Sequence, residues 1–150
     1  MTKHNSSPAV IEALSHLLAD NYTLYLKTQN YHWNVTGPHF QSLHALFQTQ
    51  YEELAIANDD IAERIRALGA EAPGSFSAFA KLATITEAQE KTKWQDMIKN
   101  LADDQDKICE TANRVLKLAQ DSDDEPTIDM MIGRLSVHQK NAWMLRVHLN

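Results

Sequence analysis

The stretch Tyr31-His-Trp-Asn-Val-Thr-Gly-Pro-His-Phe-Gln-Ser-Leu-His44 joins two long segments whose apolar residues recur at helical spacing. Gly37-Pro38 in its middle is a strong turn signal, because proline cannot continue a helix and glycine adopts turn conformations that other residues avoid. The pattern therefore predicts one helix over residues 8–35, a sharp break, and a second helix over residues 39–68.

The ends of this first helix pair carry their own signals. Ser7 followed by Pro8 is typical of an N-cap and a first helical position, and Gly69 suits the position just after the second helix. From Ala70 to Lys91 the pattern becomes irregular, which predicts a long connection that crosses the bundle. One short apolar helix is expected inside this connection, around Phe76, Phe79 and Leu82.

Two further helices are expected in the second half of the chain. Thr92 with Gln95 resembles a capping box and predicts a helix over residues 93–121. Pro126 predicts the start of the last helix, over residues 126–149. No strand pattern and no internal repeat are present. Four amphipathic helices with one long middle connection predict an all-α, ferritin-like four-helix bundle.

Composition agrees with one soluble, intracellular domain. The chain has 150 residues, of which 43% are hydrophobic, and it contains only 4 Gly and 4 Pro. We expect a single domain over residues 1–150, with residues 1–7 as a short flexible arm. The single cysteine, Cys109, cannot form an internal disulfide and fits a reducing cytosol. No signal peptide or membrane-spanning run is apparent, so the predicted location is cytoplasmic.

Four residues of the first helix pair have side chains that bind metals. His32 and His44 lie at matching heights of the expected hairpin, and Asp59 and Glu63 are one turn apart on one helix face. Two imidazoles and two carboxylates suit iron, zinc or manganese. His44 and Asp59, however, are fifteen residues apart on one helix, or about 22 Å at about 1.5 Å per residue.

That separation has a geometric consequence. Fifteen helical steps of about 100° return to within about 60° of the same face, so the histidine and the carboxylates share one side of the helix. Two copies packed antiparallel about a twofold axis would bring His44 of one chain to Asp59 and Glu63 of the other. The spacing thus predicts a metal site shared between subunits.

A simpler interpretation stands beside this one. Asp59 and Glu63 lie next to Arg64 and Arg66, and exposed charged pairs on helices are commonly just solvated surface. His32 beside Trp33 is also compatible with a packed core histidine. Residue spacing alone does not favour the metal site over solvated surface charges and a packed histidine, or the reverse. A metal centre inside one bundle is not expected, because none of the seven histidines follows a glutamate by three residues.

A resemblance decides between them. The stretch from Tyr31 to His44 resembles the signature of the Dps family, the DNA-binding proteins from starved cells, and Asp59-Asp-Ile-Ala-Glu-Arg64 continues the match. Ala142-Trp-Met-Leu145 extends the similarity nearly to the end of the chain. The resemblance implies a mini-ferritin: a hollow homo-dodecamer that oxidises Fe(II), preferably with hydrogen peroxide rather than oxygen, and stores Fe(III) inside its shell.

The resemblance also implies roles for particular residues. His32 and His44 of one subunit, with Asp59 and Glu63 of its neighbour, form the catalytic, iron-binding ferroxidase site, which zinc or another divalent metal also fits. Trp33 and Trp143 match tryptophans near that site, although core packing is an alternative for both. Among the acidic residues before the last helix, Asp124 and Asp129 are candidates for lining the pores through which Fe(II) enters.

One position departs from the family pattern. Where the family has a further carboxylate ligand one turn after the second histidine, this chain has Gln48. A neutral amide binds iron more weakly than a carboxylate, so Gln48 is expected to act behind the direct ligands, and the second iron position is expected to bind more weakly than the first.

A second function is DNA binding with compaction of the nucleoid. The net charge of −6, from 14 basic and 20 acidic residues, does not favour it, since DNA binding relies on basic contacts to phosphates. The first residues supply only Lys3, with His4, and no basic tail ends the sequence. We therefore expect weak or absent DNA binding at neutral pH, despite the family's name, with a nucleoid-associated location as the alternative to the bulk cytoplasm.

Overall fold

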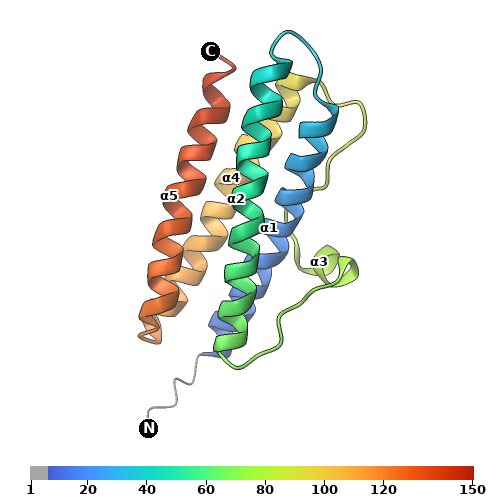
Figure 1. Cartoon of the computed structure of the whole chain (residues 1–150). Coiled ribbons are helices and arrows are strands. Elements are labelled where there is room, and N and C mark those ends of the chain that lie inside the picture. The colour runs from blue at the N-terminus through green and yellow to red at the C-terminus, as the bar shows by residue number, and fades with distance from the viewer. Residues whose placement is uncertain (1–6) are drawn as a thin grey trace.

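Four long helices form a bundle, and a fifth, short helix lies beside it (Figure 1). The computed structural model describes residues 7–150, and that part of the chain contains no strand. The helices are α1 (Pro8–Asn34), α2 (Phe40–Ala67), α3 (Phe76–Leu82), α4 (Trp94–Asp121) and α5 (Glu125–Val147). The predicted all-α bundle, including the short helix in the crossover, is confirmed. The expected N-terminal arm lies, except for Ser7, outside the described residues.

The long connection sets the topology. The helices α1 and α2 form one antiparallel hairpin, and α4 and α5 form another (Figure 1). Residues 68–93 carry the chain from the far end of α2 back along α1 to the start of α4, with α3 standing against α1. This is the long crossover that the irregular stretch after Gly69 predicted.

Local capping explains most of the helix ends. The Ser7 hydroxyl accepts a hydrogen bond from the Ala9 amide at 3.2 Å, and Gly69 has a φ of +97°, as a residue just after a helix often does. The predicted Thr92–Gln95 capping box is wrong. Lys93 is the N-cap of α4 and makes no side-chain cap, because the Thr92 hydroxyl instead donates to the Gln89 carbonyl at 2.7 Å.

Aliphatic and aromatic side chains from all four long helices fill the interior. Each fully buried large side chain contributes about 1.5–3 kcal/mol of transfer free energy. The largest of those with almost no exposed surface are Tyr31, Phe47, Leu14, Leu17, Leu24, Leu43, Leu54, Ile61, Ile65, Ile98, Leu101 and Ile108.

Buried polar residues of α1 fasten the crossover. The Asp20 carboxylate accepts hydrogen bonds from the Thr84 amide at 2.6 Å, the Thr84 hydroxyl at 2.9 Å and the Ile85 amide at 3.1 Å. The Lys27 ammonium donates to the Thr86 carbonyl at 2.7 Å. Because buried backbone groups need partners, these contacts determine where the crossover runs.

Lys27 also forms a buried ion pair, with Asp104 of α4 at 2.8 Å. Burial raises the pKa of the Asp104 carboxyl, although the bonded Lys27 ammonium acts in the opposite direction. The pair thus links the first and third long helices through a desolvated contact.

A polar chain crosses the other half of the bundle interior. Arg134 of α5 donates to both carboxylate oxygens of Glu53 on α2, at 2.5 and 3.0 Å, and to Nε2 of His138 at 2.9 Å. Because the guanidinium can only donate, Nε2 of His138 accepts, and its Nδ1–H donates to Oε1 of Gln105 on α4 at 2.6 Å. The positive charge buried between α2, α4 and α5 is therefore carried by Arg134, while His138 accepts a hydrogen bond from it.

His138 should make stability depend on pH. Burial, assisted by the nearby Arg134 charge, lowers its pKa well below the ordinary 6.5. The unfolded chain therefore binds more protons below about pH 6.5, so the free energy of unfolding should fall on acidification, by up to about 1.4 kcal/mol per pH unit from this residue. Urea denaturation followed by circular dichroism from pH 7.5 to 5 measures the slope.

A matched pair of variants isolates this contribution. His138→Gln should show a shallower decline with acidification than the wild type. His39→Gln, which changes an exposed histidine, should keep the wild-type slope. Equal slopes for His138→Gln and the wild type would contradict the assignment.

Candidate metal centre

The two histidines of the α1–α2 hairpin lie face to face, as their positions on either side of the break predicted. The rings of His32 and His44 are stacked, with centroids 3.7 Å apart and planes 13° from parallel. Phe40 stacks on His44, with ring centroids 5.0 Å apart, and Tyr51 contacts His32 edge-on, with ring centroids 5.2 Å apart. Aromatic neighbours therefore hold both imidazoles in one orientation.

A reciprocal pair of hydrogen bonds fixes the tautomer of both rings. Nδ1 of His32 lies 2.6 Å from the carbonyl oxygen of His44, and Nδ1 of His44 lies 2.7 Å from the carbonyl oxygen of His32. A carbonyl oxygen only accepts, so each Nδ1 carries the hydrogen. In the neutral imidazoles, each Nε2 then keeps its lone pair for a metal ion, the arrangement that backbone carbonyls commonly enforce in metal-binding histidines.

The stacking also bears on how many ions the histidines suit. A lone pair on Nε2 lies in the plane of its ring, and these planes are nearly parallel and 3.7 Å apart. Two such lone pairs do not converge on one ion at the usual bond length of about 2.0–2.1 Å. The geometry favours two neighbouring ions, one for each histidine, as in two-metal sites with ions about 3.5–4 Å apart.

The carboxylates form a second group on α2. Asp59, Asp60 and Glu63 offer ligand oxygens within 4.8 Å of one another, and all three are exposed. A hydrogen bond to Asp59 and the charge of Asp59 raise the pKa of the Glu63 carboxyl. Within residues 7–150, no basic side chain forms an ion pair with this group, since the nearby Arg64 pairs with Asp124 instead.

One chain does not bring the two groups together. His44 and Asp59 are separated by fifteen residues of the continuous helix α2, which corresponds to about 22 Å. The histidines are thus assembled by the hairpin and the carboxylates by one turn of α2, and neither set has enough ligands for a closed site.

Gln48 occupies the turn of α2 after His44. Its Nε2 donates a hydrogen bond to Oε1 of Glu52, one further turn along, at 2.8 Å. Both residues are exposed. Glu52 and Asp60 were not among the residues expected from the sequence, although their spacing from Gln48 and Glu63 on the same helix was a usable signal.

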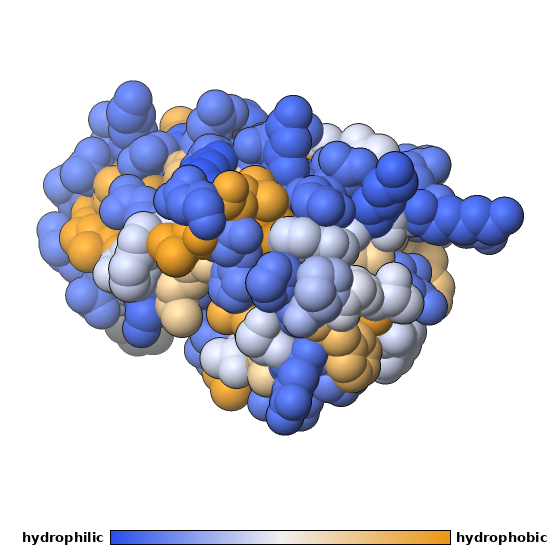
Figure 2. Space-filling view, turned by 90° about the horizontal axis from the view of Figure 1, so that it is seen from above, coloured by the Kyte–Doolittle hydropathy of each residue, from blue (hydrophilic) through white to orange (hydrophobic). Residues whose placement is uncertain are grey.

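The tryptophans are on the surface of the single chain. Trp33 is 60% exposed and Trp143 is 63% exposed, so within one chain neither packs in the core. Other large apolar residues are exposed too, namely Phe40, Ile56, Phe76, Ile132, Leu26, Val147 and Leu149. At the end of the bundle seen in Figure 2, hydrophobic groups likewise lie between hydrophilic ones on the surface.

The helices formed by residues 7–150 include none with the length and hydropathy of a membrane span.

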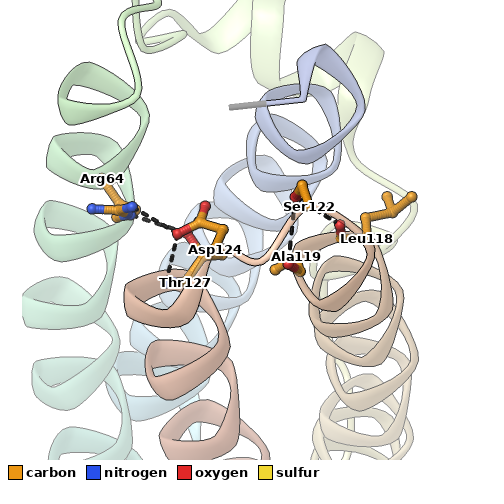
Figure 3. A network of polar contacts seen from close by, with 6 residues as sticks. All are labelled: Arg64, Leu118, Ala119, Ser122, Asp124 and Thr127. Carbon is orange, nitrogen blue, oxygen red and sulfur yellow. Dashed lines mark hydrogen bonds and ion pairs between the residues drawn. The ribbon is translucent and has the colours of Figure 1, made fainter. Parts of the chain in front are cut away.

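The acidic turn before α5 contains two different kinds of aspartate. Asp124 caps α5 by accepting from the Thr127 amide and hydroxyl, and it forms an ion pair with Arg64 of α2 at 2.9 Å (Figure 3). Arg64 also donates to the Thr127 hydroxyl at 3.0 Å. Asp129 is exposed and has no partner within residues 7–150. Of the two pore candidates, only Asp129 has a free carboxylate in the single chain.

Comparison with known proteins identifies the family of the chain. Residues 11–150 match the ferritin-like domain family. DNA protection during starvation protein 2 of Bacillus anthracis is 36% identical over 141 residues, which cover 94% of this chain and 97% of that relative. A low temperature-induced protein of Nostoc sp. is 40% identical over 139 residues, covering 91% of this chain and 78% of the relative.

Solved structures show the same fold. The Dps protein of Vibrio cholerae O1, described as a member of a broad superfamily of ferritin-like diiron-carboxylate proteins, matches with a TM-score of 0.93 and 32% identity. That match covers 99% of this chain and 93% of the other. A Dps protein of Bacillus brevis also gives a TM-score of 0.93, with full coverage of both chains and 29% identity.

The acidic turn yields a stability prediction. Asp124→Ala removes both the cap of α5 and the partner of Arg64, and should lower the free energy of unfolding by about 1–3 kcal/mol. Asp124→Asn keeps a capping oxygen and should cost less. Asp129→Asn, the exposed control, should change stability by less than about 0.5 kcal/mol. Urea denaturation compares the three, and equal effects of Asp124→Ala and Asp129→Asn would refute the capping role.

Proposed function

The chain belongs to the ferritin-like family and, within it, to the Dps proteins, and from this premise we propose that it is an iron-oxidising, iron-storing mini-ferritin. Membership of the family supports iron storage and protection of DNA in general terms. The finer proposal is that Fe(II) is oxidised, preferably by hydrogen peroxide, at sites between subunits of a hollow dodecamer. Fe(III) then accumulates inside the shell.

The observation that carries this proposal is the separation of the two ligand groups on α2. The Nδ1 atoms of His32 and His44 are bonded to backbone carbonyls, so their Nε2 atoms are the ones available to a metal at one end of the helix, whereas Asp59 and Glu63 present carboxylates at the other end, about 22 Å away. An antiparallel pair of α2 helices completes two identical sites, each with two imidazoles from one subunit and carboxylates from the next. We assign the ferroxidase role to these four residues.

The donor set suits the chemistry. Imidazole and carboxylate ligands bind Fe(II), and the negative carboxylates stabilise Fe(III) more strongly, which favours loss of an electron. Two Fe(II) substrates each give up one electron, and one peroxide accepts both as its O–O bond breaks, forming two water molecules after uptake of two protons. Removal of Fe(II) and peroxide together prevents hydroxyl radical formation. Zinc or another divalent metal fits the same ligands and would compete with iron.

Exposed groups on the single chain support assembly and iron entry. Trp33 and Trp143 are large apolar side chains left in solvent, and burial between subunits close to the site would account for them. We propose that Asp129, whose carboxylate is free, attracts Fe(II) at a pore. Asp124 is assigned there only as a structural neighbour, because its carboxylate is already bonded to Arg64 and Thr127. The cytoplasmic location stays a prediction.

The alternative function is direct binding and compaction of DNA. Two relatives are named for DNA protection, which is the reason for considering this alternative. The acidic excess of 20 Asp and Glu over 14 Lys and Arg does not favour it, and Lys3 and His4 lie outside the described residues. We propose that protection of DNA proceeds through capture of iron and removal of peroxide.

Complementation between two inactive variants tests the shared site. His44→Ala and Asp59→Ala should each lose most peroxide-dependent Fe(II) oxidation, because each variant damages every interface. Assemblies refolded from a mixture of the two should regain activity, since some interfaces then combine an intact histidine end with an intact carboxylate end. Rapid-mixing absorbance of Fe(III) measures the rates. Mixed assemblies of confirmed composition with no recovered activity would refute the intersubunit site.

A second test separates iron capture from DNA binding. The acidic chain should give no gel shift of plasmid DNA at pH 8 in moderate salt without added divalent metal, since it offers few cations to replace phosphate counterions. It should still suppress plasmid cleavage by Fe(II) and peroxide, whereas His44→Ala should not. A clear shift under these conditions, weakened by deletion of residues 1–7, would favour DNA compaction instead.

A further inference from the structure

Gln48 and Glu52 form a hydrogen-bonded pair on the face of α2 that carries His44. The three residues are spaced by four, so their side chains lie one above another along the helix. Nε2 of Gln48 donates to Oε1 of Glu52 at 2.8 Å. Both side chains are exposed, and neither has another side-chain partner within residues 7–150. Within residues 7–150, the hydrogen bond between them is thus the one polar side-chain contact of this pair.

The hydrogen bond fixes which end of the amide is free. A glutamine amide has a donating NH₂ group and an accepting oxygen on the same carbon, so holding the NH₂ toward Glu52 turns the oxygen away from it. Helical side chains lean toward the N-terminus of their helix, so Gln48 leans toward the turn of His44 and Glu52 leans toward Gln48. The free Oε1 of Gln48 thus belongs on the side of His44.

We propose that Glu52 is a positioning residue, which orients the Gln48 amide so that its oxygen is the ligand of the ion held by His44. This inference rests on the proposed function, because it concerns the second of two neighbouring ions at the same site. Because the planes of the stacked rings are nearly parallel, the Nε2 atoms of His32 and His44 would not share one ion, and an ion at His44 would need an oxygen ligand of its own.

Gln48 and Glu52 together supply what one carboxylate would supply alone. The amide provides the oxygen, and the carboxylate one turn away provides the negative charge. A hydrogen bond from the amide NH₂ to a carboxylate also polarises the amide, which puts more negative charge on its oxygen. Without Glu52, the amide is free to turn its NH₂ group toward the ion, and a donor group repels a cation.

Binding of Co(II) without oxygen tests this inference in the full assembled protein. Titration followed by calorimetry and by the visible absorption of Co(II) should resolve a tighter and a weaker ion per site in the wild type. Glu52→Ala should weaken the second ion by about tenfold, the usual effect of losing a partner that orients a metal ligand. Glu52→Gln should have a smaller effect because its amide oxygen still accepts from Gln48. Glu110→Gln, an exposed glutamate on α4, is the matched control.

A double-mutant cycle distinguishes orientation from a general structural effect. Gln48→Glu places a carboxylate beside His44, and a carboxylate presents an oxygen whichever way it turns. Glu52→Ala should therefore weaken the second ion in the wild-type background but not in the Gln48→Glu background, where it removes a like charge. Size-exclusion chromatography confirms that each variant still assembles.

The outcomes separate this inference from the function on which it rests. A normal first ion with an unchanged second ion in Glu52→Ala overturns only the role of Glu52, as does an equal loss in both backgrounds of the cycle. A wild type with a single ion per site also overturns it. A wild type that binds no Co(II) overturns the proposed function and this inference together.

Discussion

The stiffness of α2 is the constraint on which the rest of the site depends. A continuous helix of 28 residues cannot fold back on itself, so the ends of its metal-binding face stay about 22 Å apart. At one end of this face, the hairpin places His32 of α1 beside His44, and stacked rings and two reciprocal hydrogen bonds hold the two together. The carboxylates of Asp59 and Glu63 can reach these histidines only from a second copy of the chain, which is why we propose a site that exists only in the assembly.

The polar groups of the bundle interior have different partners from the candidate ligands. In the half of the core between α2, α4 and α5, Arg134 bonds to Glu53 and to His138, and burial keeps the pKa of His138 low. The Arg134 guanidinium already pairs with the Glu53 carboxylate, and Nε2 of His138 already accepts a hydrogen bond from Arg134. The interior thus uses its acidic and basic groups to join helices, whereas the exposed carboxylates of Asp59 and Glu63 form no ion pair with a basic side chain within residues 7–150, and the histidine pair consists of the buried His32 of α1 and the half-buried His44 of α2.

The fold was predictable because its signals are local. Apolar periodicity, the Gly37-Pro38 break and the caps at Ser7 and Gly69 each depend on a few neighbouring residues, and the helix bounds agree closely with them. The Thr92 capping box failed because a hydroxyl near a helix start has competing acceptors, and the preceding turn supplied one. Contacts between distant segments, such as the three hydrogen bonds from the crossover to Asp20, leave no periodic trace in the sequence.

The candidate site likewise combines features that the sequence predicts with features that only the structure shows. The height of His32 relative to His44 follows from counting residues on either side of a break, so the pairing was predictable, but the stacking of the rings depends on rotamers set by Phe40 and Tyr51. Gln48 shows the difference most clearly. The sequence marks it as a neutral residue where the Dps pattern has a carboxylate, which suggests a weaker ion position. Its hydrogen bond to Glu52 places a carboxylate one turn away, which is why we propose that the two residues act as a pair at this position.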